Sequence, residues 1–215
     1  MLRFDRNGGQ IIDGEGNRFD PVRRTWVARS GSVDGEPIDL IAAVAWLQKQ
    51  NEVPVRAPVG VIGPRDATAE QLVTAEEIGA RLADMGLSIV CGGRQGIMEA
   101  VCRGAAGRGG ISVGLLPETD PSLANPYVTV PIATGIGEAR NALVARAAFC
   151  LVVIGNSYGT LSEVALGLQF GKTVIGISGA PDVPGVRHCS QPDNVITLVG
   201  RTVFALPEED EGSPD

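Results

Sequence analysis

The chain has 215 residues and a mass of 22.3 kDa, which is enough for one sizeable hydrophobic core and only marginally enough for two. Its 44% hydrophobic and 20% charged residues are typical of a globular protein and exclude a disordered one. No apolar stretch approaches the roughly 20 residues of a membrane span, and the first residues do not resemble a secretory signal. We therefore expect a cytoplasmic protein without a membrane partner.

The net charge of −7 is concentrated at the C-terminus. Five acidic residues and no basic one follow Pro207, so we expect residues 207–215 to form an acidic disordered tail. The rest of the chain has a net charge of only −2. Because a protein that holds long nucleic acid needs a basic face, this balance excludes long nucleic acid as a partner.

The cysteines and the single histidine do not form a pattern that supports metal or nucleophilic chemistry. Cys91, Cys102, Cys150 and Cys189 have no C-x-x-C spacing, and buried reduced thiols are expected. His188 is predicted in a loop beside Cys189, and two adjacent residues are a poor pair of metal ligands. The sequence predicts no metal site, so any chemistry depends on carboxylates, arginines and backbone amides.

Residues 1–57 differ from the rest and are predicted to form an N-terminal appendage. A turn at Asp13-Gly14 between short apolar segments predicts a β-hairpin over residues 8–20. Apolar residues at helical spacing predict a helix over residues 38–50. The appendage either packs on the main domain or serves in assembly.

Strands and helices are predicted to alternate from Val59 onward. The strands are expected over residues 59–62, 87–91, 111–115, 127–130, 150–154, 173–177 and 195–199. The helices are expected over residues 69–85, up to about 106, over 137–148 and over 159–170, with a loop over 117–126. Thr68 and Gln71 are predicted to form a capping box for the first helix. Residues 58–206 should therefore form a Rossmann-like, doubly wound α/β domain with a mostly parallel sheet of about seven strands.

Ligands of such sheets bind at the carboxyl ends of the strands, beside helix N-termini. Three turns are expected at this edge, over residues 63–66, 92–96 and 155–160. Their glycines let backbone N–H groups approach a phosphate. The glycines of the second turn fit neither the Rossmann fingerprint nor the P-loop, so a tight turn without a ligand remains the alternative.

The spacing of Thr160 and Glu163 has two interpretations. It matches a capping box, which is purely structural. Alternatively, Gly159 and Thr160 offer amides and a hydroxyl to a phosphate, and Glu163 reaches a sugar hydroxyl. Arg140, in the first turns of the preceding helix, should lie at the same edge of the sheet.

Together these segments resemble the Lonely Guy superfamily over about residues 58–206, a superfamily that includes proteins described as possible lysine decarboxylases. The matching motifs are Gly92-Gly93-x-x-Gly96-Ile97-Met98-Glu99, Gly110-Ile-Ser-Val-Gly-Leu-Leu-Pro117, Arg140-Asn141 and Tyr158-Gly159-Thr160-Leu-Ser-Glu163. Residues 135–141 and 153–155 are most similar to the branch near the molybdenum cofactor carrier proteins.

The resemblance implies a nucleotide-binding Rossmann-like fold, commonly dimeric. In the hydrolase branch it also implies cleavage of a nucleoside 5′-monophosphate into base and ribose 5-phosphate, for which no cofactor is required. Carried over by position, Arg140 and Glu163 are the catalytic pair. The ligand- or phosphate-binding residues are then Gly63, Arg65, Gly92, Gly93, Gly96, Met98, Asn141, Gly155, Asn156, Ser157, Tyr158, Gly159 and Thr160.

The sequence departs from the family pattern in two places. The family's Pro-Gly-Gly is here Gly155-Asn156-Ser157, and its Arg-Lys pair is Arg140-Asn141. The side chains of Asn156 and Ser157 either crowd a phosphate or supply replacement donors. Three functions stay open: a phosphoribohydrolase, a non-catalytic carrier or sensor of a nucleotide-like or pterin-phosphate ligand, and a structural subunit with no ligand. In the first two the partner is a small phosphorylated ligand.

Two apolar stripes indicate how the protein assembles. They consist of Ala139, Leu143, Val144 and Ala147 on one helix and Ala165, Leu166, Leu168 and Gln169 on the next. Together they offer more apolar positions than one sheet face needs, so we expect a homodimer or a higher even oligomer. The alternative is that the core of the monomer uses both stripes.

Overall fold

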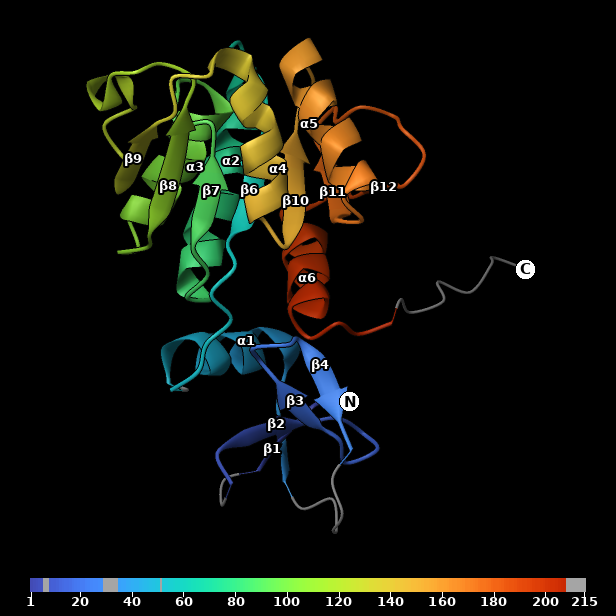
Figure 1. Cartoon of the computed structure of the whole chain (residues 1–215). Coiled ribbons are helices and arrows are strands. Elements are labelled where there is room, and N and C mark those ends of the chain that lie inside the picture. The colour runs from blue at the N-terminus through green and yellow to red at the C-terminus, as the bar shows by residue number, and fades with distance from the viewer. Residues whose placement is uncertain (6–7, 29–34, 51, 208–215) are drawn as a thin grey trace.

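The fold is built on two β-sheets, a small one at the N-terminus and a large one in the rest of the chain (Figure 1). A computed structural model of the chain describes residues 1–5, 8–28, 35–50 and 52–207. Apart from Pro207, the predicted acidic tail lies outside the described residues.

The small sheet has five antiparallel strands in the order β4-β3-β2-β1-β5. Its strands are β1 (Arg3–Asp5), β2 (Gln10–Ile12), β3 (Arg18–Asp20), β4 (Thr25–Val27) and β5 (Glu36–Pro37). Strands β2 and β3 form the predicted hairpin, and Asp13 closes its turn by accepting the Asn17 N–H at 2.8 Å. Helix α1 (Leu40–Lys49) follows where a helix was predicted.

The large sheet has seven strands in the order β12-β11-β10-β6-β7-β8-β9, and every neighbouring pair is parallel. Its strands are β6 (Val59–Ile62), β7 (Ile89–Cys91), β8 (Ser112–Leu116), β9 (Val130–Ala133), β10 (Cys150–Ile154), β11 (Thr173–Ile177) and β12 (Val186–His188). The predicted doubly wound class and strand number are thereby confirmed. Because the strand order reverses between β6 and β10, the topological switch point lies between these two strands.

Helices cover both faces of the large sheet (Figure 1). They are α2 (Ala69–Asp84), α3 (Ile97–Ala106), α4 (Asn141–Ala147), α5 (Tyr158–Gln169) and α6 (Pro192–Val203). One core contains buried residues of α1, α2, α3 and α6, and a separate one contains those of α4 and α5. The predicted capping box of α2 is confirmed, since Thr68 Oγ1 accepts the Gln71 N–H at 3.2 Å and Gln71 Oε1 accepts the Thr68 N–H at 3.0 Å.

The strand predicted over residues 195–199 is wrong. Those residues lie in α6, whose buried positions Val195, Ile196, Val199 and Val203 share one face of the helix. Their β-branched side chains favour a strand locally, but packing against the sheet overrides that propensity. The seventh strand is instead β12, which includes His188, a residue predicted in a loop.

Two further predictions between β8 and β10 need correction. The strand predicted over residues 127–130 begins only at Val130, because Asn125 forms a turn in which its carbonyl accepts the Val128 N–H at 3.2 Å. The single helix predicted over residues 137–148 is divided into a 3-10 helix, η2 (Gly137–Arg140), and α4. Residues 121–123 of the predicted loop form a short 3-10 helix, η1 (Pro121–Leu123).

Aromatic residues join the small sheet to the end of α6. Phe19 packs edge-on against Phe204 with a centroid distance of 4.8 Å, and Trp26 stacks on Phe204 at 6.1 Å. The Trp26 indole also donates to the Phe204 carbonyl at 2.8 Å. Of the two roles considered for the N-terminal segment, the structure therefore shows packing on the main domain.

Helices α2 and α3 approach each other closely at Gly104. A Cβ atom at this position would overlap the carbonyl oxygen of Glu76 on α2, which is backbone and cannot move aside easily. These two helices follow β6 and β7, so their spacing fixes two of the turns at the carboxyl edge of the sheet.

We predict that Gly104→Ala lowers the free energy of unfolding by about 1–3 kcal/mol, because an added methyl group overpacks this contact. The matched control is Gly107→Ala at the end of the same helix, where φ is −60° and the nearest atom to a new Cβ is 3.5 Å away. The control should leave stability unchanged or raise it by up to about 1 kcal/mol. Urea denaturation of both variants measures the difference, and equal stabilities would contradict the prediction.

Candidate functional site

A cleft of about 720 Å³ opens at the switch point, where β6, β7 and β10 end. We call it the switch-point cleft. Twelve of the predicted site residues line it: Gly63, Arg65, Gly92, Met98, Arg140, Asn141, Asn156, Ser157, Tyr158, Gly159, Thr160 and Glu163. The cleft thus brings together residues from the turns after β6, β7 and β10, from the 3-10 helix η2 and from helices α3, α4 and α5.

Three predicted ligand-binding glycines, Gly93, Gly96 and Gly155, do not line the cleft. Each has φ near +70°, and each packs against the protein's own atoms. A Cβ at Gly93 would lie 3.0 Å from Gly114 Cα, and one at Gly155 would lie 2.8 Å from Gln71 Nε2. At Gly96 it would overlap two carbonyl oxygens of the turn after β6. The structure therefore gives these glycines a role in shaping the turns.

Gly92 lines the cleft and makes room for a buried cation. A Cβ at this position would lie 2.6 Å from Arg140 Nη2 and 2.7 Å from the sulfur of Met98. Without a side chain at 92, the Arg140 guanidinium can lie directly on the backbone of the turn after β7. The side chain of Arg140 is only 5% exposed.

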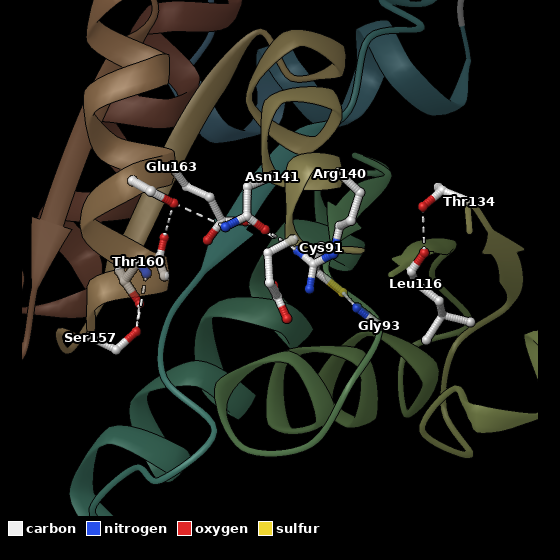
Figure 2. Close-up of polar contacts among 12 residues, drawn as sticks. Cys91, Gly93, Leu116, Thr134, Arg140, Asn141, Ser157, Thr160 and Glu163 are labelled. Carbon is white, nitrogen blue, oxygen red and sulfur yellow. Dashed lines mark hydrogen bonds and ion pairs between the residues drawn. The ribbon is translucent and has the colours of Figure 1, made fainter. Parts of the chain in front are cut away.

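Arg140 is held by polar contacts to α4 and α5 (Figure 2). Its Nη1 atom donates to Asn141 Oδ1 at 2.8 Å and lies 3.5 Å from Glu163 Oε1. Asn141 in turn donates to Ser162 Oγ at 3.0 Å. The Nε atom of Arg140 is buried and has no hydrogen-bond partner within the described part of the chain. The guanidinium is therefore positioned from one side and keeps an unused donor.

The N-terminus of α5 presents free backbone donors to the cleft. Ser157 is the N-cap, and its Oγ accepts the Thr160 N–H at 3.1 Å (Figure 2). The N–H groups of Tyr158 and Gly159 precede that bond and have no acceptor among residues 52–207. A helix N-terminus with free amides attracts anions.

Of the two interpretations of the Thr160–Glu163 spacing, the capping box is wrong. Helix α5 begins at Tyr158, so Thr160 occupies the third helical position and Ser157 caps the helix in its place. Glu163 lies in the second turn and is buried, with its side chain 8% exposed. Its burial therefore needs an explanation other than capping.

The environment of Glu163 favours its neutral form. Burial raises the pKa of its carboxyl group to about 8; the nearby Arg140 opposes this shift and Glu138 adds to it. Near neutral pH the carboxyl group is therefore largely protonated, and Arg140 donates to a neutral acceptor. A protonated carboxyl group in a cleft can donate a hydrogen bond or a proton to a ligand.

Two residues that line the cleft, Glu138 and Ser162, were not predicted as site residues, although they lie within residues 135–141 and 158–163. Glu138 lies 3.6 Å from Arg65 through its Oε1 atom, and this ion pair connects η2 with the turn after β6. Ser162 donates to the Gly159 carbonyl at 2.6 Å and thereby connects Asn141 to the first turn of α5. Only their place within the motifs could have indicated that they belong to the site, because Glu and Ser are common residue types at protein surfaces.

Within the described ranges, no group of three or more His, Cys, Asp or Glu side chains is arranged to hold a metal ion. No helix in those ranges is both long and apolar enough to cross a bilayer.

Comparisons with known proteins match the large-sheet part of the chain. A family model described as the SLOG cluster4 family matches residues 56–200. An uncharacterized protein of Archaeoglobus fulgidus is 33% identical over 138 residues, which make up 64% of this chain and 91% of that protein. The small sheet and α1 lie outside the matched family region.

Solved structures cover the same part. The molybdenum cofactor binding protein of the phototrophic bacterium Rippkaea orientalis is 34% identical, with a TM-score of 0.63, over 67% of this chain and 96% of that chain. The molybdenum cofactor carrier protein of Chlamydomonas reinhardtii is 33% identical, also with a TM-score of 0.63, over 69% of this chain and 99% of that chain.

We predict that Glu163→Gln stabilises the protein increasingly as the pH rises. An unfolded Glu has a pKa of about 4.3, whereas burial raises that of folded Glu163 to about 8. Between these values the folded state binds more protons than the unfolded state, so wild-type stability falls as the pH rises. Gln does not titrate, so the melting temperature of the variant minus that of the wild type should grow from pH 5 to pH 8.

The control for this experiment is Glu70→Gln, which removes an exposed carboxylate from the first turn of α2. Its melting-temperature difference from the wild type should change little over the same pH range. A Glu163→Gln difference that shrinks toward pH 8 would show that the carboxylate is stabilised by Arg140 and would overturn the prediction.

Proposed function

The chain belongs to the SLOG cluster4 family of the Lonely Guy superfamily, and from this premise we propose that it carries or senses a small phosphorylated ligand without converting it. The proposed ligand is a nucleotide or a phosphorylated pterin of the molybdenum cofactor class, bound in the switch-point cleft. The observation that supports this best is the similarity to proteins described as molybdenum cofactor binding and carrier proteins, at 33–34% identity over nearly their whole length.

The cleft offers complementary groups for a phosphate. The free amides of Tyr158 and Gly159 lie at the positive end of the α5 dipole. Arg140 adds a buried positive charge on the other side. At the departure from the family pattern, the Ser157 side chain caps Thr160 and leaves the preceding amides free for a phosphate.

The surroundings of Arg140 and Glu163 favour binding over catalysis. Stabilising an oxocarbenium-like transition state needs an ionised carboxylate, and Glu163 is largely neutral near pH 7 because burial raises its pKa to about 8. Asn141, where the superfamily pattern has Lys, fixes the guanidinium of Arg140 and cannot donate a proton as an ammonium group does. Both features suit a site that holds its ligand unchanged.

A phosphoribohydrolase is the second candidate. It is favoured by one observation, the contact of Arg140 and Glu163 at 3.5 Å inside the cleft. A neutral carboxyl group with a pKa near 8 is suited to protonate a departing base at neutral pH. Release of free base from a panel of nucleoside 5′-monophosphates, lost in Glu163→Gln, would support this candidate over the carrier.

The proposal includes a cytoplasmic location. The sulfur atoms of Cys91 and Cys102 lie 3.7 Å apart as free thiols. A close, unbonded pair of thiols is in keeping with a reducing compartment.

We predict that Gly159→Val abolishes ligand binding and leaves the fold intact. A Cβ at this position meets nothing closer than Ser157 Oγ at 3.7 Å, so the protein accommodates the new side chain, which then blocks access to the amides of α5. The measurement is mass spectrometry of small molecules that copurify with the protein. A phosphorylated nucleotide or pterin should accompany the wild type and be absent from the variant.

The control is Ala106→Val, at an exposed position of α3 outside the cleft, which should retain the ligand. Equal ligand content in Gly159→Val and wild type, with both folded, would remove the N-terminus of α5 from the site.

The homodimer is proposed on α4 and α5, which lie beside each other on one face of the large sheet (Figure 1). Leu143 is 43% exposed on α4, and Leu161 is 38% exposed on α5. Ala147 and Ala165 are also exposed, whereas Val144 is fully buried in the core. The monomer therefore uses part of the predicted stripes and leaves the rest at the surface.

We predict that Leu143→Glu converts the dimer into a monomer, because a charge in an apolar interface must be desolvated. Light scattering at micromolar concentration should give twice 22.3 kDa for the wild type and 22.3 kDa for the variant. Val73→Glu, which replaces an exposed apolar residue on α2, is the control and should remain dimeric. A wild type that scatters as one chain would refute the interface.

A further inference from the structure

A second and larger cavity, of about 1540 Å³, lies at the opposite end of β10 and β11 from the switch-point cleft. One wall is a face of α6, which contributes side chains from Asn194 to Thr202 at helical spacing. The other walls are the end of α4, the turn before β11 and residues 187–190. The two cavities share no lining residue. We call this second cavity the basic groove.

The lining of the basic groove is strongly and uniformly positive. It includes five basic side chains, Arg24, Arg146, Lys172, Arg187 and Arg201, together with His188. The described lining contains no Asp or Glu, although the whole chain has a net charge of −7. Positive charge is therefore gathered in one cavity of an acidic protein.

Three of these cations contact only neutral groups. Arg24 Nη2 donates to the Thr202 carbonyl at 2.5 Å, and its guanidinium lies 4.6 Å from the ring centre of Phe149. Arg146 lies 3.5 Å from the ring centre of Phe170. No ion pair within the described residues involves Arg24, Arg146 or Lys172.

The cations are close enough to repel one another. Lys172 Nζ donates to the carbonyl of Arg146 at 3.4 Å. Burial lowers the pKa of Lys172, and the charges of Arg146 and then Arg24 lower it further. Arg24 Nε is buried without a hydrogen-bond partner in the described part of the chain. An anion in the groove would relieve the repulsion between the cations.

We propose that the basic groove binds the polyphosphate chain of a small molecule, as a second ligand site separate from the switch-point cleft. A chain of several phosphates suits the groove because its basic side chains come from several walls: the segment before β4, the end of α4, the turn before β11, β12 and α6. A small ligand fits better than long nucleic acid, since the chain as a whole has a net charge of −7 and would repel a long polyanion.

Part of the basic groove lies outside the region that matches the family model. Arg24 lies before β4, and Arg201 lies at the end of α6, and both fall outside residues 56–200 that match the family model. The aromatic contacts of Trp26 with Phe204 bring the small sheet against α6, which places Arg24 in the groove. Docking of the N-terminal sheet therefore adds Arg24 to a groove whose other basic side chains belong to the large-sheet part, and the site is independent of the function proposed for the cleft.

The test is isothermal titration calorimetry with inorganic triphosphate at an ionic strength of about 0.15 M, which screens weak surface attraction. Arg146→Gln and Lys172→Gln should each weaken binding about tenfold, as expected for the loss of one charge-assisted hydrogen bond. Arg108→Gln removes the same charge from an exposed site outside both cavities and should leave the affinity unchanged. Gly159→Val, which blocks the switch-point cleft, should also retain triphosphate binding.

Several results would overturn the proposal. One is binding lost in Gly159→Val and unaffected by the groove variants, which would assign the anion to the cleft alone. Another is equal weakening by Arg108→Gln, which would indicate attraction by net charge only. A third is the absence of binding both in the full chain and in a chain ending at Pro207, which lacks the acidic tail. Binding of a ten-residue oligothymidylate without triphosphate binding would likewise replace the small ligand by a single-stranded nucleic acid.

Discussion

The burial of the Arg140 guanidinium is the constraint on which the switch-point cleft depends. A buried charge is tolerated only where polar groups or an opposite charge compensate it. Gly92 lets the cation lie on the backbone of the turn after β7. Asn141 Oδ1 accepts a hydrogen bond from Arg140 Nη1, and Glu163 Oε1 lies 3.5 Å from the same nitrogen. Each of these contacts joins a different element to Arg140. The cation thereby fixes the relative positions of β7, α4 and α5, and with them the shape of the cleft.

The edge of the sheet that carries the site could be predicted because strands, glycine turns and helices follow one another regularly in the sequence. The roles of the individual glycines could not be predicted from the sequence. A glycine is required both where a ligand approaches the backbone and where the protein's own atoms do, and the two cases look alike in sequence. Gly93 and Gly96 belong to the second case, while Gly159 lies open to the cleft. Only the surroundings of each turn distinguish them.

Prediction from local secondary-structure propensity was also wrong where tertiary contacts determine the structure. Residues 195–199 are rich in β-branched side chains and look like a strand, but Val195, Ile196 and Val199 also share one face of a helix. The start of α5 was misplaced for a related reason, since Ser157 and Thr160 are both good N-caps and only packing selects Ser157. The three-residue strands of the small sheet are too short to show a period, so only one hairpin was visible in advance.

Both tryptophans of the chain, Trp26 and Trp46, belong to the N-terminal segment, and they pack on Phe204 and Phe4. The large-sheet part from β6 to α6 contains no tryptophan. Intrinsic tryptophan emission therefore reports on the attachment of the small sheet and does not report on ligand binding in the switch-point cleft. An unfolding curve followed by this emission and one followed by helical circular dichroism would measure different parts of the same molecule. If the two parts unfold separately, the difference between the two unfolding transitions measures the free energy with which the N-terminal segment is attached to the rest of the chain.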